Sequence, residues 1–261
     1  MFIDTHCHLN FKAFRDDFLE VAKKSYGLGV KKIIIVGSDS DTSANALEIA
    51  KKINTEIADF AFVAVGIHAV HTDRINFAKI KELAGDPLSV AIGESGMDFF
   101  HDAEHKTEDQ QIKLFKEHIE LALKLNKPLI IHNRQADEKV REIIDSYPEL
   151  TKAVLHCFGA DHHMASWAVK RGFLLSFTGN ITYGNKRVKK AIERTPIEKT
   201  MVETDAPYNI PEPLKSKGIE QCEPYMVKEV IKKIAQVKKI DFEVASKQIY
   251  QNSKEFFSFE I

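Results

Sequence analysis

The sequence has little cysteine, and charge of neither sign dominates it. Its three cysteines, Cys7, Cys157 and Cys222, form no Cys-x-x-Cys pair and are odd in number, which argues against a disulfide framework and favours a reducing compartment. The 37 Lys and Arg residues nearly balance the 38 Asp and Glu residues, so the net charge is −1. No overall field would attract nucleic acid to such a molecule, and any binding of nucleic acid would have to be local.

Long hydrophobic runs and low-complexity segments are also missing. No apolar run approaches the ~20 residues of a membrane-spanning helix, and the first residues do not combine a basic flank with an apolar stretch as a signal peptide would. With 12 glycines and 8 prolines, the chain offers no linker at which to place a domain boundary. We therefore expect one domain over residues 1–261 in the cytoplasm, without membrane association or an obligatory protein partner.

Short apolar runs typical of buried strands alternate along the chain with segments of helical spacing. The strands are expected at 2–8, 31–37, 61–68, 88–94, 128–132, 153–158, 173–177 and 199–205. The helices are expected at 11–28, 40–53, 73–83, 107–125 (with a capping box at its start), 136–146, 161–171, 186–194, 224–237 and 241–257. This alternation predicts an α/β fold, a single-domain (β/α)8 TIM barrel. The alternative is an open doubly wound sheet, but no Gly-x-Gly-x-x-Gly follows the first strand.

The first strand carries the start of a metal site. Because side chains alternate along a strand, Asp4, His6 and His8 are expected on one face and Thr5 and Cys7 on the other. Two imidazoles on one face at the end of a strand supply half of a metal site. By themselves they are more typical of hydrogen-bonded structural histidines than of metal ligands.

Residues of metal-binding type recur at or near the carboxyl ends of six of the eight expected strands. They are His6, His8, His68, Glu94, His132, His156 and Asp205. In barrels of this kind the active site is built at that end of the strands. Alternation places several of them above residues that line the barrel, pairing Ile92 with Glu94, Ile130 with His132, Val154 with His156, and Met201 with Glu203 and Asp205. Burying so many imidazoles and carboxylates together is costly without a cation, which predicts a metal centre.

These nitrogen and oxygen ligands outnumber the three that one catalytic zinc ion uses. They suit two divalent ions ~3.5–4 Å apart that share a carboxylate and a water, and Glu94 is placed to be the shared carboxylate. Such a pair makes hydroxide near neutral pH, which predicts hydrolysis with Asp205 as both ligand and general base. We interpret Cys7 and Cys157 as packing residues that point away from the mouth of the barrel.

Six segments carry these residues in a recognisable order. They are Ile3-Asp4-Thr5-His6-Cys7-His8-Leu9, Gly66-Ile67-His68, Ile92-Gly93-Glu94-Ser95-Gly96-Met97-Asp98-Phe99, Ile131-His132-Asn133-Arg134, His156-Cys157-Phe158-Gly159 and Glu203-Thr204-Asp205-Ala206-Pro207-Tyr208. As a set they resemble the signatures of TatD-type metal-dependent deoxyribonucleases, within the amidohydrolase-like barrels. The resemblance runs over essentially the whole chain. It implies a phosphodiesterase that acts on single-stranded DNA ends as a 3′ exonuclease, with Mg²⁺, or with Zn²⁺ or Mn²⁺.

The resemblance also implies roles for individual residues. One metal ion would be held by His6, His8, Glu94 and Asp205, and the second by Glu94, His132 and His156. Positions near the substrate or behind the ligands are matched by His68, Asp98, Arg134 and Glu203. The planar fork of Arg134 suits a phosphate oxygen, and a salt bridge at the barrel rim is the alternative for this residue.

The chain departs from the family pattern at three places. Where Gly-x-His-Pro is usual, Ala69 follows His68 and an additional His71 comes two residues later. Where Arg-Asn-Glu-Pro is usual, the chain reads Gln221-Cys222-Glu223-Pro224, which removes one positive charge. Met97-Asp98-Phe99 stands for the usual Leu-Asp-Tyr, which is a mild change.

Three functions remain open from the sequence. The first is the metal-dependent nuclease. The second is a two-metal hydrolase of an ester or amide bond, for example the ester of an aminoacyl-tRNA, favoured by the neutral net charge and by the missing Arg before the last helices. The basic cluster 186–190 is more typical of a solvated helix face than of a DNA patch. The third, a scaffold on a vestigial barrel, fits less well because no expected metal ligand is missing.

Overall fold

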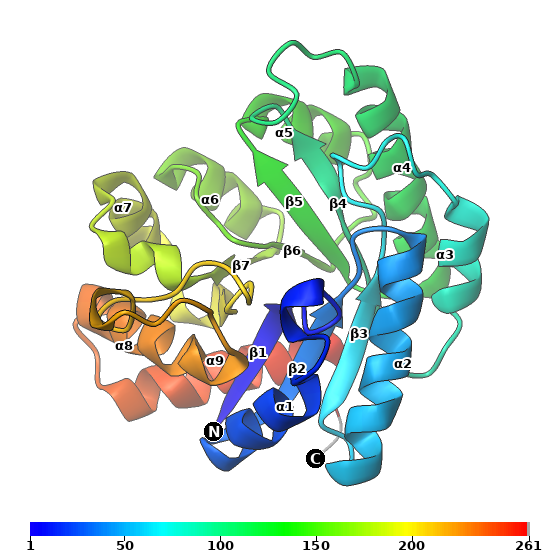
Figure 1. The fold of residues 1–261 in the computed structure, drawn as a ribbon. Coiled ribbons are helices and arrows are strands. Elements are labelled where there is room, and N and C mark those ends of the chain that lie inside the picture. The colour runs from blue at the N-terminus through cyan, green and yellow to red at the C-terminus, as the bar shows by residue number, and fades with distance from the viewer. Residues whose placement is uncertain (260–261) are drawn as a thin grey trace.

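Eight parallel strands form a nearly closed barrel in the computed structural model, which describes residues 1–259 (Figure 1). The strands are β1 (Phe2–Cys7), β2 (Val30–Val36), β3 (Ala61–Val65), β4 (Ser89–Asp98), β5 (Leu129–Arg134), β6 (Ala153–Leu155), β7 (Leu174–Phe177) and β8 (Thr200–Val202). Each strand pairs with the next one along the chain. The expected (β/α)8 TIM barrel is thereby confirmed.

Helices surround the barrel on its outside (Figure 1). They are α1 (Phe18–Gly27), α2 (Ser40–Glu56), α3 (Phe77–Leu83), α4 (Glu108–Leu125), α5 (Asp137–Asp145), α6 (His162–Lys170), α7 (Lys186–Arg194), α8 (Val227–Lys238) and α9 (Phe242–Phe257). Short 3-10 helices lie at Lys12–Phe14, Gly179–Tyr183, Ile197–Lys199, Lys215–Lys217 and Pro224–Met226. No helix within residues 1–259 is long and apolar enough to cross a membrane.

The barrel closes through the segment that follows β8 rather than through β8 itself. The backbone N–H of Asp205 donates to the carbonyl of His6, and that of His8 donates to the carbonyl of Ala206, both at 2.8 Å. Cys7 and Ala206 form the parallel bridge between the two segments. This closure sets Asp205 directly beside the two histidines of the first strand.

Two apolar layers hold the barrel together. The inner layer contains one or two side chains from most strands, among them Ile34, Ile130 and Met201, together with three phenylalanines at the end of the chain, Phe256, Phe257 and Phe259. Phe259 contacts Phe62, near the start of β3, with ring centroids 4.6 Å apart. These aromatic rings fill the amino-terminal end of the barrel, so the opposite end is the one left open for a site.

The outer layer lies between the strands and the helices, and it contains the other face of each strand, for example Ile33, Ile92 and Leu155. Cys7 is fully buried in this layer, as expected from its position beside the metal-type histidines.

Strict alternation along the strands is wrong at two places because β1 and β4 each carry a bulge. On β1, three steps from Asp4 to Cys7 pair with two steps on β2, and on β4 the same happens between Ile92 and Ser95. One extra residue reverses the alternation beyond the bulge. Asp4 therefore does not share a face with His6.

On the amino-terminal side of the bulge in β1 and in β4, the residue that points into the barrel is not the one that alternation predicted. Ile3 and Ala91 belong to the inner layer, whereas Ile92 belongs to the outer layer, although Glu94 reaches the open end of the barrel. The expected pairings of Ile130 with His132 and of Val154 with His156 are confirmed, since β5 and β6 pair in regular register there.

Smaller differences concern the ends of elements. The segment 11–28 forms a 3-10 helix at Lys12–Phe14 and then α1, rather than one continuous helix. The expected capping box before α4 is wrong, because the hydroxyl of Thr107 donates to Asp102 at 2.7 Å instead of capping the helix. The third, sixth and eighth strands each end three residues early, so His68, His156 and Asp205 lie in loops just beyond the strands.

Candidate metal centre

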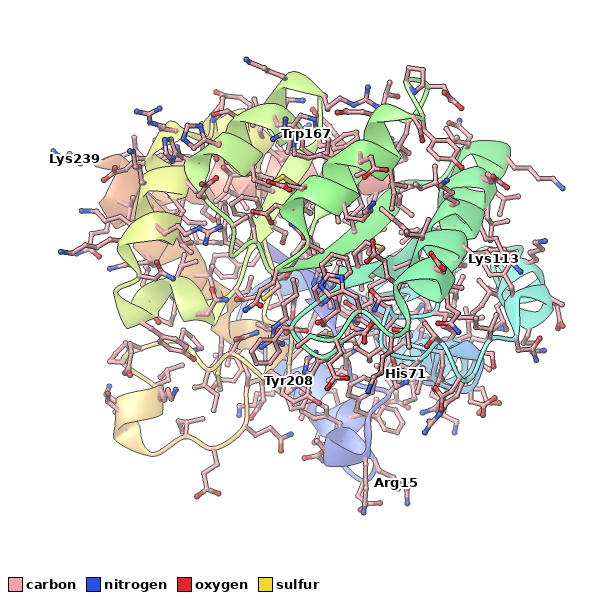
Figure 2. All side chains as sticks on the ribbon, turned by 90° about the horizontal axis from the view of Figure 1, so that it is seen from above. Arg15, His71, Lys113, Trp167, Tyr208 and Lys239 are labelled. Carbon is pink, nitrogen blue, oxygen red and sulfur yellow. The ribbon has the colours of Figure 1, made fainter. Side chains whose placement is uncertain are left out.

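The open end of the barrel leads into a cleft of about 1460 Å³. His8, Glu94, His132, His156 and Asp205 all line it, whereas His6 lies beneath them and is fully buried. In Figure 2, two further residues of the cleft, Tyr208 and His71, lie toward one edge of the molecule and Trp167 of α6 toward the opposite edge. The residues that the sequence analysis selected as ligands are thus brought together at one place.

The first group of ligand atoms comes from the end of β1 and the loop after β8. Nε2 of His6 lies 3.2 Å from Nε2 of His8, and the latter lies 3.4 Å from Oδ1 of Asp205. Nδ1 of His8 donates to the carbonyl of Val36 at 2.9 Å, which leaves the lone pair of its Nε2 free. The side-chain amide of Asn209 donates to the other oxygen of Asp205 at 2.8 Å and so orients the carboxylate.

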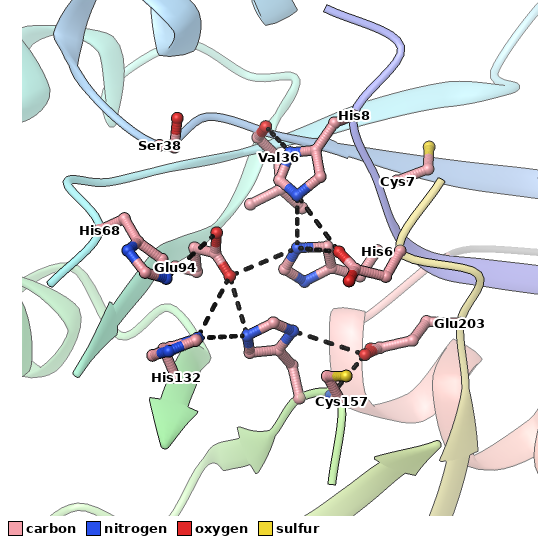
Figure 3. A network of polar contacts seen from close by, with 12 residues as sticks. His6, Cys7, His8, Val36, Ser38, His68, Glu94, His132, Cys157 and Glu203 are labelled. Carbon is pink, nitrogen blue, oxygen red and sulfur yellow. Dashed lines mark hydrogen bonds and ion pairs between the residues drawn. The ribbon is translucent and has the colours of Figure 1, made fainter. Parts of the chain in front are cut away.

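The second group comes from β4, β5 and the loop after β6 (Figure 3). Oε2 of Glu94 lies 2.8 Å from Nε2 of His156 and 4.0 Å from Nδ1 of His132. Nε2 of His132 is 3.1 Å from Oδ2 of Asp98, so it donates there and leaves Nδ1 for the cleft. The same oxygen of Glu94 is also 3.5 Å from Nε2 of His6, which places this carboxylate between the two groups.

Two close backbone approaches make room for this arrangement. A Cβ atom on Gly66 would lie 2.6 Å from the backbone of Gly93, the residue before Glu94. A Cβ atom on Gly96 would lie 1.9 Å from the carbonyl oxygen of His132. With glycine at these positions, the end of β3 can approach β4, which carries Glu94, and β4 can approach β5, which carries His132.

The buried carboxylates of the site need positive charge nearby to remain ionised. Burial opposes the ionisation of Glu94, but the imidazoles of His156 and His68 outweigh it and hold its pKa well below the usual range. Conversely, burial works against a charge on His156, but Glu94 and Glu203 outweigh it and raise the pKa of this histidine well above its usual value. Burial, followed by the proximity of His156, lowers the pKa of His6, so that its ring is neutral and has a lone pair to offer.

These donors fit a divalent metal centre. In each of the two groups the ligand atoms lie within 4.8 Å of one another, and they are imidazole nitrogens and carboxylate oxygens without a thiolate. The two groups share the oxygen of Glu94, as a pair of bridged ions would require.

Glu203 and Asp98 lie behind the ligands rather than in front of the substrate. Glu203 is 1% exposed, and its Oε1 lies 3.5 Å from Nδ1 of His156 while accepting the backbone N–H of Cys157 at 2.5 Å. Asp98 accepts from His132 and also from Nδ1 of His101 at 2.8 Å. The family pattern allowed these residues to lie either near the substrate or behind the ligands. The structure places both residues behind the ligands, although Asp98 also lines the cleft.

The two other residues expected near the substrate do line the cleft. Nε2 of His68 is 3.9 Å from Oε1 of Glu94, and burial, followed by the nearby His132, lowers the pKa of this histidine to about 3. The guanidinium of Arg134 lies over the ring of Phe100, 4.0 Å from its centroid, and within residues 1–259 it does not form the salt bridge considered as its alternative. The additional His71 also lines the cleft, with its ring centroid 6.3 Å from that of His68.

One prediction about the cleft is wrong, and several cleft residues were missed. Cys157 does not point away from the mouth: its backbone is left-handed, with φ of 42°, so strand alternation no longer applies and the residue lines the cleft. Arg187 of the supposedly solvated cluster also reaches the cleft. Asn209 and His101, which orient Asp205 and Asp98, were not selected, although the spacing Asp-x-x-His at 98–101 was a usable signal.

Comparison with known proteins shows the relationship of the chain. Residues 3–258 match the family model described as TatD related DNase. The chain is 35% identical over 262 residues to the uncharacterized metal-dependent hydrolase YabD of Bacillus subtilis, with 98% of this chain and 99% of that protein covered. It is 32% identical to the uncharacterized metal-dependent hydrolase MJ1582 of Methanocaldococcus jannaschii, with 98% and 96% covered.

Solved structures agree in fold. The crystal structure of YJJV, a TatD homolog from Escherichia coli, superposes with a TM-score of 0.87 at 23% identity, covering 99% of this chain and 98% of that one. Dihydroorotase from Saccharomyces cerevisiae shares the barrel more distantly, with a TM-score of 0.58 at 13% identity over 100% of this chain and 84% of that one. The match along nearly the whole sequence, to the family model and to these relatives alike, shows that the chain belongs to the family of TatD-related DNases.

Proposed function

We propose that this protein hydrolyses phosphodiester bonds of DNA and removes nucleotides from the 3′ ends of single strands, with two divalent metal ions such as Mg²⁺. The proposal is supported by the membership of the chain in the TatD family of metal-dependent hydrolases. The observation that carries the proposal is the position of Glu94, whose Oε2 is shared by two groups of ligand atoms at the floor of an open cleft.

Each of the two metal ions would have its own set of ligands, with one carboxylate shared between them. His6, His8 and Asp205 would hold one ion, His132 and His156 the other, and Glu94 would bridge them. Ions bound in this way supply Lewis-acid chemistry, because they lower the pKa of bound water toward neutral pH and stabilise charge on phosphoryl oxygens.

Asp205 is oriented for a second task. Its Oδ2 is held by Asn209 and its Oδ1 faces His8, so the carboxylate is fixed at the cleft wall, where it can accept the proton of the attacking water. Arg134, at the rim, is the side chain suited to a phosphate oxygen of the bound strand.

The test is the shortening of 5′-labelled single-stranded DNA in Mg²⁺ or Mn²⁺ by the wild type and by Asp205→Asn. We expect loss from the 3′ end that falls by about 10²–10⁴-fold in the variant, as for removal of a general base. Asp59→Asn is the matched control, because Asp59 has the same left-handed backbone (φ 55° against 56° for Asp205) but lies outside the cleft. Shortening that is equal in Asp205→Asn and the wild type would contradict the proposal.

A second candidate, hydrolysis of a carboxylic ester or amide bond, is favoured by one observation. Acidic residues outnumber the Lys and Arg residues along the cleft wall, which suits an uncharged carbonyl better than a polyanion. If DNA and RNA remain intact while aminoacyl-tRNA or p-nitrophenyl esters are cleaved in an Asp205-dependent way, this second function replaces the first.

A further inference from the structure

The cations of the cleft are unequally available to a substrate. Among the described residues that line it, three carry a permanent positive charge, namely Arg134, Lys139 and Arg187. Nζ of Lys139 lies 2.8 Å from Glu142 and 3.6 Å from Glu108. These carboxylates already balance the charge of Lys139.

Arg187 is also engaged, since its Nη2 lies 3.5 Å from Oδ2 of Asp137. Arg134, in contrast, has no carboxylate partner within 4.0 Å among residues 1–259, and its guanidinium lies over the ring of Phe100. Of the three, Arg134 is therefore the cation whose hydrogen-bond donors remain free for an anion in the cleft.

Phe100 links Arg134 to the metal centre. The backbone N–H of Phe100 donates to Oδ1 of Asp98 at 3.0 Å, and Oδ2 of the same carboxylate accepts from His132. The ring of Phe100 is 49% exposed, so its packing adds little to the core, yet the guanidinium of Arg134 lies 4.0 Å from its centroid. The position of the free cation is thus tied to the position of a predicted metal ligand through one aromatic side chain.

Away from the metal centre, the cleft does not attract a long polyanion. Four carboxylates line it there, Glu108, Asp137, Glu138 and Glu142, against the three cations. The whole chain has a net charge of −1, so no wider field compensates for this local balance. A protein that tracks a DNA backbone needs several unpaired Lys or Arg side chains along the path.

We propose that this cleft recognises a single phosphate beside the one that reacts, through Arg134 held in place by Phe100, so that its substrates are short oligonucleotides as readily as long strands. This inference rests on the proposed phosphodiesterase function. Phe100 acts as a positioning residue, because it reaches the substrate only through Arg134. The enzyme gains nothing from phosphates farther along a strand, since no unpaired cation of the cleft remains to contact them.

The first test compares kcat/KM per 3′ end for a trinucleotide, which has one phosphate beside the reacting one, a hexamer and a 20-mer of single-stranded DNA over a range of KCl concentrations. One cationic contact predicts rates within about threefold of one another and a slope of log kcat/KM against log salt of about −0.7. A 20-mer cleaved at least ~10-fold better than the trinucleotide, or a slope of about −2 or steeper, overturns the inference and leaves the nuclease intact. Cleavage of none of the three overturns both.

The second test addresses Phe100. Phe100→Leu removes the aromatic face, and we expect KM to rise by about 2- to 30-fold with kcat unchanged, as for loss of a cation–π contact. Phe100→Tyr, which keeps that face, should restore the KM of the wild type. In an Arg134→Gln background, Phe100→Leu should change KM no further, because no cation is left to position.

Tyr183→Leu is the matched control for this series. Tyr183 is also a partly exposed ring beneath a cation, with Nζ of Lys215 at 4.4 Å from its centroid, but this lysine, unlike Arg134, does not line the cleft. Equal effects of Phe100→Leu and Tyr183→Leu on KM, or additive effects of Phe100→Leu and Arg134→Gln, would overturn the role assigned to Phe100.

Discussion

At the scale of single residues, the site depends on side chains that orient the ligands as much as on the ligands themselves. A buried hydrogen-bond acceptor fixes the tautomer of two predicted ligand histidines. The acceptor is the carbonyl of Val36 for His8 and the carboxylate of Asp98 for His132. Nδ1 of His156 faces the carboxylate of Glu203 at 3.5 Å, and the two residues are almost inaccessible to solvent. Substitution of a residue behind the ligands should therefore weaken metal binding without removing a contact to the substrate.

Glu203→Gln tests this at one atom. Gln keeps the volume and an oxygen for the N–H of Cys157, but it removes the charge that supports His156. We expect the Kd for Mn²⁺, measured by titration calorimetry on chelator-treated protein, to rise by about 10- to 100-fold. Glu193→Gln on the surface of α7, where Glu193 pairs only with Lys189, is the control and should leave the Kd unchanged. An unaltered Kd in Glu203→Gln would remove Glu203 from the site.

At the scale of elements, the short loops after the strands are held by contacts with the surrounding helices. His118 of α4 is fully buried, and its Nε2 accepts the backbone N–H of Ile67, the residue before His68, at 3.0 Å. Its Nδ1 donates to the carbonyl of Leu114 at 2.7 Å. The histidine must be neutral to make both bonds, and burial lowers its pKa from 6.5 to about 4.

This pKa predicts how the stability of the protein changes with pH. Because the pKa of His118 is lower in the folded state than in the unfolded state, protons bind preferentially to the unfolded chain. The stabilisation is complete above pH 6.5 and is lost as pH falls from 6.5 to 4, by about 3 kcal/mol in total.

The measurement is urea unfolding in EDTA at pH 7.5 and at pH 4 for the wild type and His118→Gln. Gln can make both hydrogen bonds without titrating, so the variant should lose less stability on acidification than the wild type, by up to about 3 kcal/mol. Other titrating groups cancel in this difference. Identical losses in the two proteins would mean that His118 does not carry this part of the pH dependence.

At the scale of the whole molecule, the barrel gathers buried charge at one end. His6, Glu94 and His156 are each less than 10% exposed, and six residues of metal-binding type from β1, β4, β5 and the loops after β6 and β8 meet there. Burying these groups together raises the free energy of the folded state, and a bound cation offsets this increase. Metal binding should therefore stabilise the fold as well as support activity.

Thermal unfolding measures this coupling. At a concentration one hundred times its Kd, one bound ion adds about 2.7 kcal/mol, which corresponds to about 5–10 °C in Tm for a chain of this size. We expect that rise on going from EDTA to Mn²⁺ in the wild type and its loss in His8→Gln. His162→Gln, a change in the surface cluster at the start of α6, should retain the rise. The same Tm in EDTA and in Mn²⁺ would contradict a coupled metal centre.

The order of strands and helices was determined by the sequence itself, because apolar runs of strand length alternate with segments of helical spacing from Phe2 to Phe257. The gathering of His6, Glu94, His132, His156 and Asp205 could also be predicted, since parallel strands of a barrel end on the same side and each of these residues follows an apolar run. Local pattern was sufficient for both.

Only the tertiary structure decided which way some of these side chains point and what lies behind them. The bulges in β1 and β4 depend on pairing with β2 and β5, so no pattern within Asp4–Cys7 or Ile92–Ser95 reveals them. The left-handed turn at Cys157 and the contact between Arg134 and Phe100 likewise join residues whose positions depend on different segments of the chain. Distances between segments far apart in sequence are set by packing, and a linear pattern carries no information on packing at that range.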